Sequence, residues 1–256
     1  MKVLAIGDVV GKPGRRVVKK LLPGLKKQHQ VDLVVINGEN AAGGLGLTSE
    51  TARELLDCGG DVITSGNHIW VQKEILPYLN GKLPIVRPLN YPPGAPGRGY
   101  IVAGKVLVVN LMGRTFMNNV LDCPFRTMDR LLGELEKRPP VVIVDFHAEA
   151  TSEKVAMGKY LDGRVSAVLG THTHVTTADE RVLPRGTAYI SDIGMTGPID
   201  SVIGDNAEDV LSRFLTGIPN RLTVAEGRVM LNAVLIEIDP GSGKASKIER
   251  IYREVD

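Results

Sequence analysis

The feature that most constrains the fold is a regular alternation of apolar runs and helical segments in the first third of the chain. Short runs rich in β-branched residues lie at Val3–Ile6, Val31–Ile36 and Asp61–Ser65. A basic helical stretch from Arg15 separates the first two runs, and a second predicted helix separates the next two. Such β-α-β-α-β alternation predicts a buried parallel sheet with helices on its faces.

After a loop rich in proline and glycine at Pro84–Gly99, the predicted strands follow one another more closely. A helix near Met128–Lys137 interrupts them, and hairpin signals lie at Gly104-Lys105 and near the end of the chain. We therefore predict one α/β domain over residues 1–256, with parallel and antiparallel parts. The strands predicted in this part are Tyr100–Ala103, Val106–Leu111, Val141–Val144, Val165–Leu169, Val182–Leu183, Ala188–Ile190, Leu231–Ile238 and Ala245–Tyr252.

Composition excludes several classes of protein. The 31 basic and 29 acidic residues leave a formal charge of +2, too small to indicate a nucleic-acid-binding protein. Two cysteines are too few for a disulfide scaffold or a structural zinc site. No apolar run approaches the ~20 residues of a membrane-spanning helix, and the first residues do not read as a secretory signal. We expect a cytoplasmic protein with no membrane partner.

Several predicted strands end in polar residues. In open α/β sheets, the carboxyl ends of the strands are where loops converge and ligands bind. Four of the five histidines lie at these ends, and His29 is expected on the solvated surface. The residues concerned are Asp8, Glu39, Asn40, Asn67, His68, His147, His172 and His174.

Taken singly, each of these residues has an ordinary structural explanation as a cap, a turn residue or a buried histidine. The pair His172-x-His174 is more specific, because alternate residues of an extended segment face the same side and can reach one cation or two neighbouring ones. The set offers imidazole, carboxylate and carboxamide groups but no thiolate. That donor chemistry indicates Mn, Fe or Zn.

The order of these residues resembles the motif series of the calcineurin-like metallophosphoesterases. The segments INGENAAGGLG, TSGNHIW, VDFHAEATSEK, GTHTHV and SDIGMTGP are more closely similar to those of YmdB-like bacterial 2′,3′-cyclic-nucleotide phosphodiesterases. Val10 and Glu39 depart from the wider superfamily, which has histidine and aspartate there, and the YmdB-like group shares both changes. The resemblance implies a metallophosphoesterase sandwich (α/β/β/α) of two stacked mixed sheets flanked by helices.

The resemblance also implies two divalent cations, most readily Fe or Mn, with Zn also compatible. A hydroxide bridging them would attack the phosphodiester. His68 would protonate the leaving oxygen or donate a hydrogen bond to the phosphoryl group, and the sequence does not separate these roles. One cation would be held by Asp8, Glu39, Asn40 and His174, and the other by Glu39, Asn67, His147 and His172.

Two other functions stay open at this stage. One is a phosphomonoesterase or nuclease on the same site. The other is a regulatory protein that binds nucleotides or RNA ends and turns them over only incidentally. The resemblance favours a homo-oligomer, and the stretch Gly194–Pro198 has no chemistry that we can derive from its residues.

Overall fold

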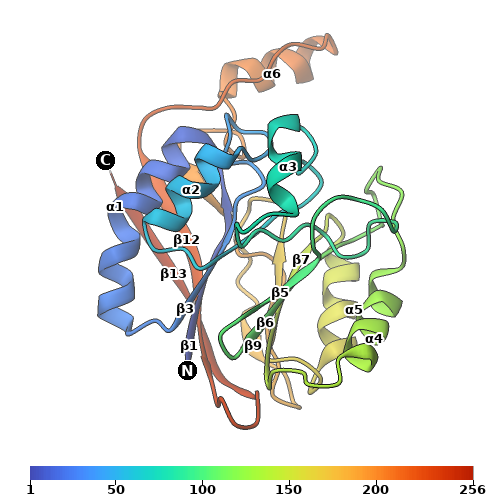
Figure 1. The fold of residues 1–256 in the computed structure, drawn as a ribbon. Helices are drawn as coiled ribbons and strands as arrows, with labels where there is room; N and C mark the ends of the chain where they lie inside the picture. The colour runs from blue at the N-terminus through green and yellow to red at the C-terminus, as the bar shows by residue number, and fades with distance from the viewer. Residues whose placement is uncertain (256) are drawn as a thin grey trace.

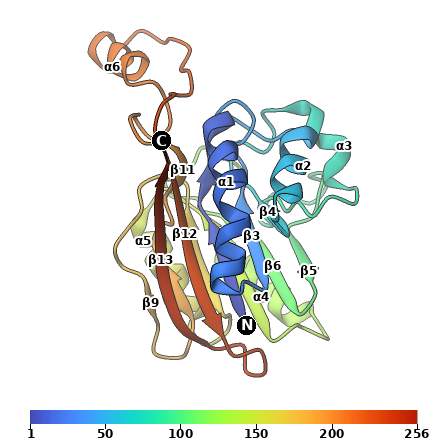
Figure 2. The same cartoon turned by 90° about the vertical axis from the view of Figure 1, so that its left-hand side faces the viewer.

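Alternate residues of a β-strand face opposite sides of its sheet, and apolar residues occupy both sides of the central strands in this chain. The computed structural model, which describes residues 1–255, accordingly has two stacked sheets with helices on both outer faces (Figures 1 and 2). Both sheets mix parallel and antiparallel pairs. The predicted α/β/β/α sandwich is confirmed.

The first sheet contains the strands that the opening alternation predicts. β1 (Lys2–Ile6), β3 (Leu33–Asn37) and β4 (Val62–Thr64) pair in parallel in chain order. On its other side, β1 pairs antiparallel with β12 (Val229–Ile238), which forms the terminal hairpin with β13 (Ala245–Val255). The two remaining strands of this sheet are β11 (Met195–Pro198) and β2 (Asp8–Val9).

The second sheet has six strands in the order β5-β6-β7-β8-β10-β9. Its four inner strands pair in parallel, and each edge strand pairs antiparallel with its neighbour. The strands are β5 (Tyr100–Ala103), β6 (Val106–Met112), β7 (Val141–His147), β8 (Ala167–Thr171), β9 (Arg181–Val182) and β10 (Ala188–Ile190).

Helices cover the outer face of each sheet, and one helix projects from the body of the molecule (Figures 1 and 2). α1 (Gly11–His29) and α2 (Ser49–Asp57) lie on the first sheet, while α4 (Pro124–Glu134) and α5 (Thr151–Leu161) lie on the second. The projecting helix is α6 (Ala207–Thr216). Two short helices, η1 (Lys73–Ile75) and α3 (Leu76–Leu79), follow β4.

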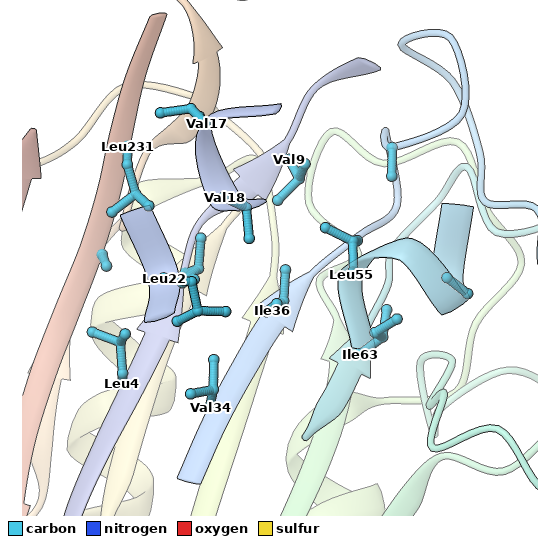
Figure 3. Close-up of a cluster of buried hydrophobic side chains, with 14 of the residues drawn as sticks. Leu4, Val9, Val17, Val18, Leu22, Val34, Ile36, Leu55, Ile63 and Leu231 are labelled. Carbon is cyan, nitrogen blue, oxygen red and sulfur yellow. The ribbon is translucent and has the colours of Figure 1, made fainter. Parts of the chain in front are cut away.

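Three apolar layers hold these elements together. In the first layer, Val18 and Leu22 of α1 pack against Leu4, Val34 and Ile36 of the first sheet (Figure 3). Burial of this kind stabilises the fold by about 25 cal/mol per Å² of apolar surface. Within residues 1–255, no helix has both the length and the apolar character needed to cross a membrane.

The other two layers use the opposite faces of the same strands. Val35 faces Val108 and Ile143 in the layer between the sheets. On the outer face of the second sheet, Phe146 of β7 packs with Met157 of α5. The buried layer between the sheets fixes how the carboxyl ends of the two sets of parallel strands meet.

Some boundaries differ from those predicted. α1 begins at Gly11, four residues before the predicted start at Arg15, because Pro13 is compatible with the first turn of a helix. α4 begins and ends earlier than Met128–Lys137. Neither α5 nor α6 was predicted from the sequence.

Candidate metal centre

The carboxyl ends of parallel strands from both sheets meet at one edge of the sandwich, which is the upper edge in Figure 1. Asp8 follows β1, the pair Glu39-Asn40 follows β3, and Asn67-His68 follows β4. His147 is the last residue of β7, and His172 and His174 follow β8. The eight predicted site residues form one continuous set of contacts, described below.

Glu39 lies at the middle of this set and is fully buried. Its Oε1 lies 3.2 Å from His147 Nε2 and 3.3 Å from His68 Nδ1, and it accepts a hydrogen bond from Asn40 Nδ2 at 3.1 Å. Burial alone would raise the pKa of Glu39, but the charges and hydrogen bonds of His147 and His68 outweigh it and lower the pKa well below its ordinary value. Glu39 is therefore an anion available to a cation.

His147 is held from behind by a chain of buried hydrogen bonds. Its Nδ1 donates to Thr171 Oγ1 at 2.9 Å, and that hydroxyl donates to Asp145 Oδ1 at 2.7 Å. Nε2 is thereby directed toward Asn67 Oδ1, at 2.9 Å, and toward Glu39. Burial would lower the pKa of His147, but the neighbouring carboxylates outweigh it and raise the pKa to about 9. A bound cation would replace the proton on Nε2.

The two histidines after β8 have unusual backbone conformations. His172 has φ of 103° and His174 has φ of 67°, a region that residues other than glycine rarely adopt and that costs about 1–3 kcal/mol. These angles place His172 Nδ1 at 3.0 Å from His147 Nε2, and His174 Nε2 at 3.1 Å from Asn40 Nδ2. Burial and the His147 charge lower the pKa of His172 to about 3, so its ring is neutral.

Asp8 supplies the clearest sign of a missing partner. Its side chain is fully buried, and Oδ2 accepts a hydrogen bond from the His172 amide at 3.3 Å. Oδ1 has no hydrogen-bond partner within residues 1–255 and lies 3.8 Å from His174 Nε2. Burial raises the pKa of Asp8 to about 6. An unpartnered buried oxygen destabilises the fold, and a cation here would remove that penalty.

The residues present therefore fit a metal centre. One ligand atom each from Glu39, His147 and His172 lie within 4.8 Å of one another. Asn40 is the exception in orientation, because its Oδ1 contacts His68 Nδ1 at 2.7 Å while its amide nitrogen faces Glu39 and His174. As a cation ligand, Asn40 must present oxygen, so its amide has to turn over.

Gly66 allows the two sheets to approach closely at this point. A Cβ atom added there would lie 2.3 Å from Glu39 Oε2 and 2.4 Å from His147 Nε2. Only a glycine leaves room for these two side chains to meet. In the sequence, Gly66 stands out only as the neighbour of Asn67, and this role was not predicted.

Three side chains near the centre were not predicted. Glu149, partly exposed, lies 3.1 Å from His172 Nε2, while Asp145 and Thr171 support His147 from below. Asp145 could have been noticed in the sequence because it is a polar residue within the otherwise apolar run of β7. Glu149 had no signal beyond its place two residues after His147. The fifth histidine, His29, ends α1 and is half-buried rather than fully solvated.

Comparison with known proteins adds independent findings. The profile of the family described as YmdB-like protein matches residues 4–251. A relative from Bacillus subtilis (strain 168), named 2′,3′-cyclic-nucleotide 2′-phosphodiesterase, is 54% identical over 255 residues, which cover 98% of this chain and 96% of the relative. The motifs at the metal centre thus occur within a similarity that extends over nearly the full length of both proteins.

Two solved structures have the same fold. A hypothetical protein from Thermus thermophilus is 47% identical with a TM-score of 0.93, covering 99% of each chain. A structure described as a novel phosphatase, from Mycoplasma pneumoniae, is 38% identical with a TM-score of 0.93, covering 99% of this chain and 93% of that one.

Proposed function

This chain belongs to the YmdB-like family, and on that premise we propose that it is a metal-dependent phosphodiesterase that hydrolyses 2′,3′-cyclic nucleotides such as 2′,3′-cyclic AMP. The single observation that carries the proposal is the central position of Glu39. One carboxylate oxygen lies 3.2–3.3 Å from imidazoles contributed by each of the two sheets. The name of the Bacillus subtilis relative supports the choice of substrate.

We propose the ligand set that the resemblance implies. Asp8, Glu39, Asn40 and His174 would hold one cation, Glu39, Asn67, His147 and His172 would hold the other, and Glu39 would bridge them. Two divalent cations bound there would supply a hydroxide nucleophile at neutral pH and offset charge on the phosphate oxygens. The mixture of oxygen donors and imidazoles favours Mn²⁺ or Fe²⁺, and it also accepts Zn²⁺.

His68 lies beside the proposed cations without belonging to either ligand set. Its side chain is 30% exposed, and its Nδ1 is engaged by Asn40 and Glu39. Nε2 has no hydrogen-bond partner within residues 1–255, so it is free to meet a substrate oxygen. When Asn40 turns its oxygen toward a cation, its amide nitrogen faces Nδ1 and donates to it, so the proton of the neutral ring lies on Nε2. Nε2–H can then donate a hydrogen bond to the phosphoryl group or a proton to the leaving oxygen, which are the two roles that the resemblance implies.

The test is a substrate panel assayed with Mn²⁺-loaded protein. We expect 2′,3′-cyclic AMP to be hydrolysed to a nucleoside monophosphate, because its strained five-membered ring lowers the barrier that the site has to overcome. Nucleoside monophosphates and short RNA should react far more slowly. Faster release of phosphate from the monophosphates, or cleavage of RNA, would instead make the chain a phosphomonoesterase or a nuclease on the same site.

A Glu39→Gln variant separates catalysis from a regulatory role in binding nucleotides or RNA ends. The substitution keeps the shape of the side chain but removes the anion that both cations need. If the variant still binds the nucleotide but does not correct the phenotype of a deletion strain, hydrolysis is the function. Full correction by the variant, with hydrolysis abolished, would mean that binding is the function.

We further propose that residues 1–256 form one domain that acts in the cytoplasm as a homo-oligomer. The layer between the two sheets and the shared metal centre support one domain. Cys58 and Cys123 are both free thiols, which is consistent with a reducing compartment. Exposed apolar side chains on α6, including Phe214 and Leu215 at 80% and 84%, support self-association.

A further inference from the structure

A buried ion pair lies directly beneath the loop that carries His172 and His174. Lys154 of α5 and Asp192 approach to 2.6 Å between Nζ and Oδ2, and their side chains are 2% and 1% exposed. Neither residue belongs to the ligand set proposed above. Buried lysines and aspartates are uncommon, and a buried pair is often no more stabilising than apolar residues of the same size. A role other than stability therefore has to be sought for this pair.

The carboxylate of Asp192 binds the residue between the two histidines. Its Oδ2 accepts hydrogen bonds from Thr173 N at 3.1 Å and from Thr173 Oγ1 at 2.8 Å. Its Oδ1 accepts a hydrogen bond from Gly194 N at 2.8 Å. One carboxylate thus holds two chain segments, and the ammonium group of Lys154 compensates its charge.

The backbone that follows Asp192 extends these contacts to the predicted ligands. Gly194 O accepts a hydrogen bond from the Asp8 amide at 3.1 Å, and Met195 N donates to His174 O at 3.1 Å. Asp8 and His174 belong to the same proposed cation site, although they are 166 positions apart in the chain. The segment around Gly194, whose chemistry the sequence did not reveal, connects them.

We propose that Asp192, held by Lys154, is a positioning residue for the metal centre: it fixes Thr173, and with it His172 and His174, relative to Asp8. This inference rests on the proposed function, because it assumes that these residues hold cations. It also explains how the strained backbone of His172 and His174, on either side of Thr173, is maintained. A loop with φ values of 103° and 67° stays in place only when its surroundings hold it there.

The test compares Asp192→Asn with Asp162→Asn in the full-length protein. Asp162 is also buried, and it lies at the C-terminal end of α5, whereas Lys154 lies near the N-terminal end. Each of its carboxylate oxygens accepts a hydrogen bond from Arg185 N at 3.1 Å. Mn²⁺ affinity is measured by titration calorimetry. Amide hydrogen exchange at Thr173 and Gly194 is measured in the metal-free protein, so that this readout does not depend on activity.

We expect Asp192→Asn to weaken Mn²⁺ binding by about 10–100-fold, as for other supports of metal ligands. A side-chain amide has one acceptor oxygen, so at least one of the two backbone amides should also exchange faster. The Asp162→Asn control should leave both readouts unchanged. Because Asp192→Asn leaves the Lys154 charge unpaired, the double variant Lys154→Met/Asp192→Asn is measured too. It should unfold near the wild-type temperature and still bind Mn²⁺ weakly.

Wild-type affinity for Mn²⁺ in either Asp192 variant would overturn the inference, and so would unchanged protection of both amides. A wild-type protein that bound no Mn²⁺ would instead overturn the proposed function. In that case, the exchange of the Thr173 and Gly194 amides would still decide whether Asp192 positions the loop.

Discussion

Replacing Gly66 with alanine tests the geometry of the metal centre with a single added methyl group. The new Cβ would lie 2.3 Å from Glu39 Oε2 and 2.3 Å from His147 Cδ2, whereas ordinary contacts begin at 3.4 Å. The two side chains must therefore retreat by about 1 Å, and a misplacement of that size typically costs about 100-fold in rate. We expect kcat for 2′,3′-cyclic AMP to fall by about that factor, or about 2.7 kcal/mol in activation free energy.

The matched control is Gly133→Ala. Gly133 lies in α4, and a Cβ added there has no heavy atom within 4 Å. Alanine is favoured over glycine inside a helix by about 0.5–1 kcal/mol, so this variant should be slightly more stable and fully active. Gly66→Ala should lose about 1–3 kcal/mol of unfolding free energy from overpacking and still fold. Steady-state kinetics and thermal unfolding of both variants give the comparison.

A Gly66→Ala protein with wild-type kcat and wild-type Mn²⁺ affinity would contradict this prediction. That result would mean that Glu39 and His147 do not need their present separation for activity. Equal losses in the Gly66 and Gly133 variants would point to a general effect on the fold.

Three further predictions concern individual side chains. His68→Ala should bind the same number of Mn²⁺ ions as wild type and lose about 10²–10⁴-fold in kcat; loss of metal would make His68 a ligand. Thr171→Val removes the hydroxyl that accepts the hydrogen bond from His147 Nδ1. The free energy of unfolding should fall by about 1–3 kcal/mol, and Mn²⁺ affinity should fall by about 10–100-fold. Unchanged Mn²⁺ affinity, measured by calorimetry, would mean that Thr171 does not hold His147 in place for the cation. Burial alone would raise the pKa of Asp179, but hydrogen bonds from Ser191 outweigh it and hold the pKa below 3.8. Its stabilising effect is therefore present above pH 3.8 and lost in acid, so Asp179→Asn should destabilise the protein at pH 7 and not at the lowest pH where it is folded. Denaturation that shows the same difference at both pH values would disprove this assignment.

The parts of the fold and site that the sequence predicts are those governed by local pattern. Val3–Ile6 and Val31–Ile36 are apolar on both faces, which indicates strands covered on both sides, and their polar ends follow directly. Because parallel strands of one sheet end at the same edge, the positions of Asp8 and Glu39 along the chain predict their meeting. His147 ends a strand of the second sheet, and its place beside them was implied by the family resemblance. The roles of these residues as ligands stay predictions.

The parts that were not predicted depend on partners distant in the chain. α5 lacks an amphipathic pattern because two of its inward residues are Lys154, which faces Asp192, and Gly158, whose Cβ would lie 2.4 Å from the Tyr189 ring. Neither residue looks like part of a core until its partner is known. The insertion of β12 between β1 and β11 likewise has no local signal, since it joins the two ends of the chain.

The pairing of β1 with β12 has a consequence for protein synthesis. β1 is made first, but its antiparallel neighbour begins at Val229, and the Gly7 amide beside Asp8 donates to Asn232 O at 3.0 Å. A nascent chain on the ribosome therefore lacks this support beside Asp8 until β12 has emerged. The proposed metal centre can therefore be completed only after β12 has been made.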